Sequence, residues 1–210
     1  MQAVIFDMWG TLVDGAVRSP LRKTHRLLAP AVEFGEFVEQ FEKITMTAPM
    51  ESQKDMFTNA ADAMDLACTD EDVEKLIGIW NKNALLAKVF DDAIPSLDEL
   101  KKKGIKLAII SNTASFHAHD VLDRLDLRKY FDVVALSYEM GKLKSDPSFL
   151  SEVIEKLGVP KEEILLVGDS VESDMRCADQ AGVQGLLIDR RGRHEYAGSI
   201  LSLNEVVTKV

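Results

Sequence analysis

Cysteine and long apolar runs are scarce in this sequence of 210 residues, and positive charge is outnumbered by negative charge. The two cysteines, Cys68 and Cys177, lie far apart and lack CxxC spacing, which excludes a disulfide framework and argues against a zinc site. No apolar run approaches the ~20 residues that a membrane-spanning helix needs, and no basic segment precedes the first apolar run as in a signal peptide. We therefore expect a cytoplasmic protein with no membrane partner.

Negative charge exceeds positive charge, because 35 Asp and Glu residues stand against 25 Lys and Arg residues, a formal net charge of −10. This balance gives no overall electrostatic support for binding nucleic acid or an anionic membrane. The apolar content of 46% is ordinary for a globular protein, and the length is typical of one domain with a smaller insertion. We expect no nucleic-acid partner, and the sequence predicts no particular oligomeric state.

Short, continuously apolar runs alternate with amphipathic segments in two parts of the chain. Continuous runs are typical of strands that are covered on both faces. They occupy residues 3–6, 106–111, 132–136, 163–169 and 185–188. Gly104, Gly158 and Gly182 each end an amphipathic segment, and a glycine at that place is a helix stop signal. The alternation predicts an α/β fold with a doubly wound, Rossmann-like parallel sheet and right-handed crossovers.

The remaining part of the chain, residues 14–92, lacks such runs and shows helical periodicity instead. Ser19 and Pro20 have the order of an N-cap residue and a first helical residue. Further along, Phe37 and Phe41 recur on one helical face. We therefore predict an all-helical cap domain of residues 14–92, inserted into a core domain of residues 1–13 and 93–210.

Polar side chains follow the predicted strands at the edge where ligands bind in doubly wound sheets. They are Asp7, Ser111, Asn112, Thr113, Lys144, Asp169 and Asp174. Carboxylates from different strands offer the hard oxygen ligands that Mg²⁺ prefers. A lysine and a hydroxyl can hold phosphate oxygens, and a carboxylate beside the metal can attack phosphorus. The set predicts one shared site for phosphoryl transfer.

Four segments resemble, in order, the motifs of the haloacid dehalogenase (HAD) superfamily. "FDMWGTLVD" resembles the first motif, with Asp7 in the nucleophile position. "IISNT" is similar to the second, with Ser111 as phosphate binder. "GKLKSDP" resembles the third through Lys144, although Ser145 stands where a proline is usual, and "LLVGDSVESD" resembles the fourth.

The resemblance implies a Mg²⁺-dependent hydrolase with a C1-type helical cap. Its implied catalytic residues are Asp7 and Lys144. The implied phosphate site comprises Thr11, Ser111, Asn112 and Lys144. The implied metal site comprises Asp7, the backbone carbonyl of Trp9, Asp169 and Asp174. The implied reaction is hydrolysis of a small phosphorylated metabolite through an aspartyl-phosphate at Asp7.

Trp9 stands where the phosphatases of this superfamily usually carry a second aspartate, which protonates the leaving alcohol and activates water, a contribution of typically ~10²–10⁴-fold. Three interpretations follow: a phosphatase in which water, the cap or the substrate handles the proton, a dehalogenase- or phosphonatase-like hydrolase, or a non-catalytic phosphate-binding or regulatory protein. The dehalogenases lack the arrangement of Gly168, Asp169 and Asp174, so its retention favours Mg²⁺ and a phosphoryl substrate. Trp9 is also compatible with simple packing beneath the cap.

Two weaker features involve basic residues. A basic stretch in the predicted cap either faces solvent or grips the substrate and supplies the missing proton; it consists of Arg18, Arg22, Lys23, His25 and Arg26. Arginines after the last predicted strand either touch the site or lie in a solvated turn; they are Arg190, Arg191 and Arg193. We expect His117 and His119 to be solvated, because two residues on a helix do not share a face.

Overall fold

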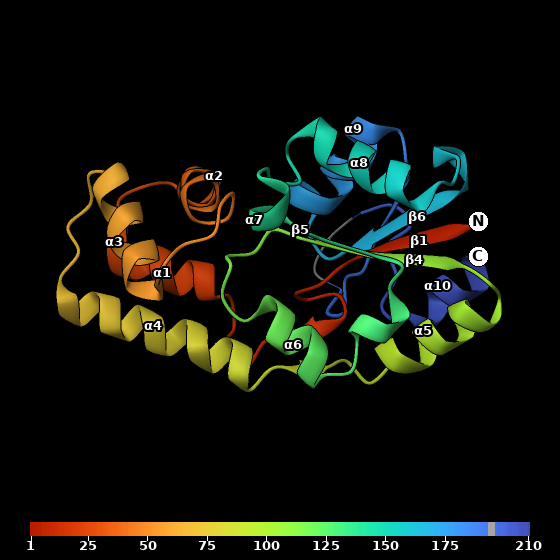
Figure 1. Ribbon diagram of the computed structural model, residues 1–210, viewed down its shortest axis with the longest axis horizontal. Helices are drawn as coiled ribbons and strands as arrows, with labels where there is room; N and C mark the ends of the chain where they lie inside the picture. Colours follow the sequence, from red (N-terminus) through yellow and green to blue (C-terminus); the bar gives the residue numbers. More distant parts are fainter. Residues whose placement is uncertain (193–195) are drawn as a thin grey trace.

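The computed structural model describes residues 1–192 and 196–210 and contains a five-stranded sheet with the order β5-β4-β1-β6-β7 (Figure 1). All four strand pairs are parallel. The strands are β1 (Ala3–Asp7), β4 (Lys106–Ser111), β5 (Val133–Leu136), β6 (Ile164–Gly168) and β7 (Gln184–Leu187). The predicted α/β fold is confirmed, and the first, central strand places its carboxyl end between those of β4 and β6.

Helices cover both faces of the sheet because successive side chains of each strand point to opposite faces. In β1, Val4 and Phe6 belong to one buried cluster, and Ala3 and Ile5 belong to the other. Figure 1 shows α8 (Pro147–Leu157) and α9 (Arg176–Ala181) above the sheet. Below it lie α5 (Ala93–Lys102), α6 (Ala118–Arg124) and α10 (Asn204–Lys209). No helix of the described residues is both long and apolar enough to cross a bilayer.

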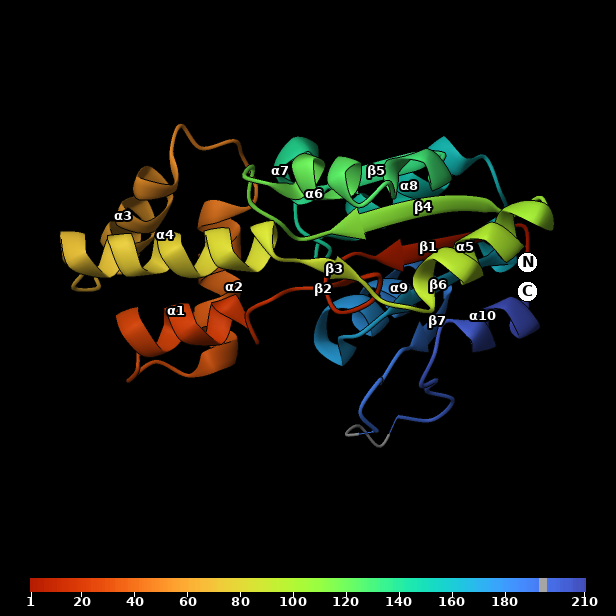
Figure 2. The same ribbon diagram turned by 90° about the horizontal axis from the view of Figure 1, so that it is seen from below.

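Four further helices form a bundle beyond the carboxyl edge of the sheet. They are α1 (Pro20–Leu28), α2 (Phe34–Thr45), α3 (Gln53–Ala63) and α4 (Asp70–Leu85). The bundle has its own core, in which Phe37 stacks on Phe41 and the Trp80 indole donates a hydrogen bond to Thr24 Oγ1 at 3.0 Å. Figure 2 shows that the antiparallel pair β2 (Val13–Asp14) and β3 (Lys88–Val89) links the bundle to the sheet.

Local sequence signals explain where several helices begin. Ser19 is the N-cap of α1 and accepts a hydrogen bond from Arg22 N, with Pro20 in the first turn, as predicted. Thr69 and Asp72 form a capping box at the start of α4, in which each side chain bonds the backbone of the other residue. These caps fix the N-termini of α1 and α4, the two helices that are adjacent in sequence to β2 and β3.

Two predicted helices differ from the sequence pattern near the site. The amphipathic segment that ends at Gly182 begins as a π-helical turn, η3 (Val171–Met175), before α9 starts. In addition, α6 begins only at Ala118, because His117 adopts a left-handed backbone conformation with φ of 70°. The short helix α7 (Ser137–Met140) and the 3₁₀ turns η1 (Arg128–Tyr130) and η2 (Lys161–Glu163) complete the fold.

The expectation that His117 and His119 are solvated is wrong for His117, whereas the His119 side chain is 39% exposed. The His117 ring is half-buried and lies 2.8 Å from Asn81 Oδ1 of α4. The His119 ring lies 2.6 Å from Glu139 Oε1 and also contacts Arg128. His117 precedes α6 in a left-handed conformation, so its ring does not follow the spacing of the helix and points toward the bundle. A purely helical pattern does not predict this orientation.

Candidate active site

Three carboxylates meet at the carboxyl edge of the sheet. Asp7 ends β1, Asp169 follows β6, and the π-helical turn η3 carries Asp174. Each offers an oxygen that lies within 4.8 Å of the other two. Asp7 and Asp174 are buried, whereas Asp169 is exposed, so the cluster opens to solvent on the Asp169 side. The structure thus brings together residues that are separated by more than 160 positions in the sequence.

Two glycines make this close approach possible. Gly10 has a φ of 85°, and a Cβ at that position would collide with the Asp169 carboxylate. A Cβ at Gly168 would collide in the same way with the Asp174 side chain. Glycine adopts positive φ without a steric penalty and leaves room for a neighbour to approach the backbone. The two motifs therefore require glycine beside their carboxylates for geometric reasons.

Lys144 connects two of the carboxylates. Its buried ammonium donates to Asp7 Oδ1 and, at 2.8 Å, to Asp174 Oδ1. Burial lowers the pKa of Lys144, but the Asp174 and Asp7 charges raise it by more, so the side chain stays a cation. The Thr11 hydroxyl donates to the other oxygen, Asp7 Oδ2, at 3.2 Å. Both oxygens of Asp7 are therefore held in position.

The donor set at this edge fits a divalent cation. Burial raises the pKa of Asp7, and although Lys144 opposes this shift, Asp174 and Asp169 add to it. Three carboxylates with one ammonium leave excess negative charge in a largely buried site, and a cation relieves that imbalance. All-oxygen ligands favour a hard ion such as Mg²⁺ or Ca²⁺.

The end of β4 supplies the polar groups beside this cluster. Ser111 is buried at the last position of the strand, and Asn112 follows it. Asn112 Oδ1 accepts a hydrogen bond from the backbone N–H of Lys144 at 2.9 Å. The Asn112 Nδ2 group donates to Glu42 Oε2 of α2 at 2.7 Å. The second and third sequence motifs are therefore joined to each other and to the helical bundle.

Glu42 is a site residue that the sequence did not reveal. Burial raises its pKa, although the hydrogen bond from Asn112 and the Lys144 charge act in the opposite direction. Its neighbours in sequence, Phe41 and Lys43, give no hint of this role, because the first packs in the bundle core and the second is exposed. Only the position of α2 against the strand edge identifies Glu42.

Comparison with known proteins agrees with this geometry. A family model described as haloacid dehalogenase-like hydrolase matches residues 1–182. The chain is a HAD-like hydrolase. It is 34% identical over 108 residues to a glyceraldehyde 3-phosphate phosphatase of Methanopyrus kandleri, and this match spans 51% of the chain and about half, 46%, of that relative.

Two longer matches cover nearly the whole HAD-like hydrolase. A phosphorylated carbohydrates phosphatase of Thermotoga maritima is 30% identical over 188 residues, which span 88% of this chain and 83% of the relative. The crystal structure of a HAD phosphatase from Thermococcus onnurineus superposes with a TM-score of 0.65 at 25% identity, covering 100% of this chain and 97% of that one. The family predicted from the four motifs and the α/β fold predicted from the alternating segments are both confirmed.

In this HAD-like hydrolase, Trp9 contributes no ionisable group to the site. Its half-buried side chain packs against the larger of the two clusters beside the sheet. The loop around it closes tightly, because Gly10 N donates to Val13 O at 2.8 Å. The packing interpretation of the indole therefore accounts for its contacts.

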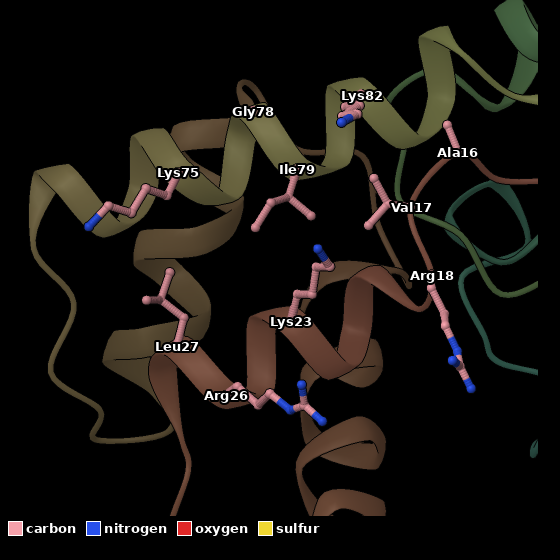
Figure 3. Close-up of a pocket in the computed structure, with 10 residues that line it drawn as sticks. All are labelled: Ala16, Val17, Arg18, Lys23, Arg26, Leu27, Lys75, Gly78, Ile79 and Lys82. Atoms are coloured by element: carbon pink, nitrogen blue, oxygen red, sulfur yellow. The ribbon is translucent and has the colours of Figure 1, made fainter.

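The basic stretch of the bundle divides into two parts. His25 is half-buried, and its ring lies 2.7 Å from Val32 O. Arg22 is exposed, and its guanidinium stacks 4.0 Å from the centre of the Phe34 ring. The other cations line a cavity of about 640 Å³ between α1 and α4 (Figure 3). Its charged lining residues are Arg18, Lys23, Arg26, Lys75 and Lys82. The solvated-face interpretation holds for these residues better than a role in the acidic cluster.

Arg190 neither touches the acidic cluster nor lies in a solvated turn. Its guanidinium forms a two-pronged ion pair with Asp92 at 2.9 Å and donates to the Thr11 carbonyl at 2.8 Å. It also stacks 3.8 Å above the centre of the Phe90 ring. Arg190 therefore supports the β1 loop from behind. Arg193, which the sequence placed with it, lies outside the described residues.

Proposed function

We propose that this HAD-like hydrolase is a Mg²⁺-dependent phosphatase that acts on a small phosphorylated metabolite through an aspartyl-phosphate at Asp7. The observation that supports it best is the juxtaposition of Asp7 with Lys144, Asp169 and Asp174 at one strand edge. The relatives described above, which are named as phosphatases of small phosphorylated compounds, support the same reaction class. We propose a cytoplasmic location, where small phosphorylated metabolites are found.

The proposed mechanism begins with in-line attack by Asp7 on phosphorus, with Thr11 holding the second carboxylate oxygen in place. Ser111 at the end of β4, Asn112 just after it, and Lys144 in the loop between α7 and α8 hold phosphoryl oxygens. When bound, Mg²⁺ would neutralise phosphate charge. Its proposed ligands are Asp7, Asp169 and the Trp9 carbonyl, with Asp174 in support.

We further propose that residues 14–92 act as a cap over this edge, on a core of residues 1–13 and 93–210. The two-stranded link at Val13–Asp14 and Lys88–Val89 is narrow, and the bundle has a separate hydrophobic core. Such a construction allows the cap to move as a unit and to exclude bulk water during transfer.

A substrate screen with matched controls tests the proposal. The purified chain is assayed with phosphate esters, phosphonates and 2-haloacids in parallel, with Mg²⁺ and with EDTA. We expect hydrolysis of phosphate esters that EDTA abolishes and that Asp7→Asn lowers by at least ~10³-fold, because the nucleophile is lost. Metal-independent release of halide would instead establish dehalogenase chemistry, and phosphate binding without turnover of any substrate would establish a sensor.

A further inference from the structure

The proposed phosphatase lacks an acid on the β1 loop, and the contacts of the site restrict what can replace it. Asp7 is the proposed nucleophile, and Asp169 and Asp174 belong to the proposed metal site. The Lys144 ammonium already donates to Asp7 and Asp174 and is proposed to hold a phosphoryl oxygen. The replacement must therefore come from outside the strand-edge motifs.

Glu42 is the bundle carboxylate that hydrogen-bonds to the strand edge in the described part of the chain. Its Oε2 accepts from Asn112 Nδ2 at 2.7 Å, and Asn112 is in turn fixed by the Lys144 backbone. The Lys144 ammonium then contacts Asp7. A continuous series of contacts thus runs from the nucleophile to Glu42. Figures 1 and 2 both show α2 on the side of the bundle that faces the sheet.

The orientation of the Asn112 amide determines which oxygen of Glu42 can carry a proton. Asn112 Oδ1 must be the acceptor because its partner is a backbone N–H, so Nδ2 is the group that donates to Glu42 Oε2. The other oxygen, Oε1, makes no hydrogen bond to any described residue. A proton on Oε1 is therefore available to a ligand. Burial raises the pKa of Glu42, which favours the protonated form at neutral pH more than in an exposed glutamate.

We propose that Glu42 is the general acid and base of this HAD-like hydrolase and takes the place of the carboxyl group that Trp9 lacks. This inference rests on the proposed phosphatase function. In the first step Asp7 attacks phosphorus, the bond from phosphorus to the ester oxygen breaks, and Glu42 gives its proton to the departing alkoxide. In the second step the Glu42 carboxylate takes a proton from water, whose oxygen attacks phosphorus. The bond to Asp7 then breaks, and inorganic phosphate leaves with Glu42 again protonated.

The test compares Glu42→Gln with wild type on two substrates in the presence of Mg²⁺. Glutamine keeps an oxygen that accepts from Asn112 but cannot donate or take up a proton in the same way. An alkyl phosphate has a poor leaving group, so we expect its kcat to fall by at least ~10²-fold. With p-nitrophenyl phosphate, whose leaving group departs without protonation, we expect a normal initial burst of nitrophenol and then a slow steady state as phosphoenzyme accumulates.

Two companion variants separate this role from simple positioning. Glu39→Gln changes an exposed carboxylate on the same helix that has no hydrogen bond among the described residues, and its rates should match those of wild type. Trp9→Asp combined with Glu42→Gln returns a carboxyl group to the β1 loop. We expect this double variant to regain at least tenfold in kcat for the alkyl ester over Glu42→Gln alone.

Several results would overturn the inference while leaving the phosphatase proposal intact. One is an active wild type together with a Glu42→Gln variant of unchanged rates, which would indicate that Glu42 only positions Asn112. Another is an equal loss on both substrates, burst included, which would indicate that the substitution disturbs the nucleophile or the phosphate site. A rise in KM with kcat unchanged would indicate substrate recognition. If wild type instead hydrolyses no phosphate ester at all, the proposed function itself fails, and the inference fails with it.

Discussion

Replacing Asp92 with asparagine should measurably destabilise the support behind the β1 loop. The Asp92 carboxylate accepts from both terminal nitrogens of Arg190 at 2.9 Å, from Ser202 Oγ at 2.8 Å and from Leu203 N at 2.9 Å. The amide oxygen of asparagine can accept the hydrogen bonds that one carboxylate oxygen of Asp92 accepts. Its NH₂ group, however, would face the second Arg190 nitrogen, and two donors cannot form a hydrogen bond. The variant therefore loses one charged hydrogen bond and the charge of the pair.

The size of the effect follows from burial. The two side chains are 18% and 13% exposed, so the pair lies between a surface ion pair and a fully buried one. Breaking a buried pair by removing one partner costs about 3–5 kcal/mol, and a hydrogen bond to a charged group contributes about 1.5–3 kcal/mol. Since asparagine keeps part of the network, we expect a loss of about 2–4 kcal/mol in unfolding free energy. In a chain of this length that lowers Tm by roughly 4–16 °C.

The pH dependence of this difference provides a sharper test. Burial raises the pKa of Asp92, but the hydrogen bonds from Arg190, Leu203 and Ser202 lower it by more, so its pKa in the folded state lies below the ordinary value of 3.8. A carboxyl group with a lowered folded pKa contributes stability that is complete above its unfolded pKa and is lost as the pH falls through its folded pKa. The gap between wild type and Asp92→Asn should therefore be constant from about pH 8 to pH 5 and shrink below about pH 4.

Urea unfolding followed by circular dichroism at several pH values measures the gap directly. The matched control is Asp91→Asn, which changes the exposed neighbouring carboxylate and should lie within about 0.5 kcal/mol of wild type. Equal losses in both variants, or a gap that persists undiminished as Asp92 becomes protonated, would refute the assigned ion pair.

Three other substitutions test separate parts of the structure. Lys144→Met leaves the buried carboxylates of Asp7 and Asp174 without their cation. The free energy of unfolding, measured by thermal unfolding in EDTA, should therefore fall by about 3–5 kcal/mol. A fall of less than about 1 kcal/mol would contradict the buried ion pairs of Lys144. Gly10→Ala adds a Cβ that would collide with the Asp169 carboxylate, at a backbone φ of 85°. We therefore expect weaker Mg²⁺ binding in calorimetry. Unchanged binding would show that the loop relaxes around the added methyl group. Trp80→Phe removes the hydrogen bond to Thr24 and should lower the free energy of unfolding by about 1–2 kcal/mol in chemical denaturation. An unchanged free energy of unfolding would indicate that water replaces the indole as the donor.

The strands of the sheet could be predicted almost completely from the sequence, because each one is marked by a short apolar run of its own residues. The run at Lys106–Ser111 is a strand with those same bounds. The other four runs differ from the observed strands by one residue, at one end for β1 and β5 and at both ends for β6 and β7. Continuous apolar segments can be covered on both faces only in the middle of a layered fold. The carboxylates at Asp7, Asp169 and Asp174 then meet because parallel strands place their carboxyl ends at one edge.

The contacts that the sequence did not reveal depend on packing between distant segments. Glu42 reaches Asn112 across 70 positions, and Asp92 reaches Arg190 across 98. No periodicity within α2 distinguishes Glu42 from the exposed Glu39 three residues earlier, because the difference lies in how the helix sits on the strand edge. The left-handed turn at His117 is similarly invisible, since a histidine in that conformation carries no glycine-like signal.

The proposed location of the acid on α2 has a consequence that an aspartate on the β1 loop would not have. A carboxyl group at position 9 would keep its distance to the nucleophile whatever the bundle does, because both groups would belong to one strand end. Among the described residues, Glu42 is held at the site through its hydrogen bond with Asn112 and through the packing of the bundle, including the contact of His117 with Asn81. Under this proposal, proton transfer would be tied to closure of the bundle, and an open bundle would bind phosphate at the strand edge without releasing the alcohol. Such a dependence would make the enzyme selective for substrates whose alcohol part lets α2 return to the position seen here.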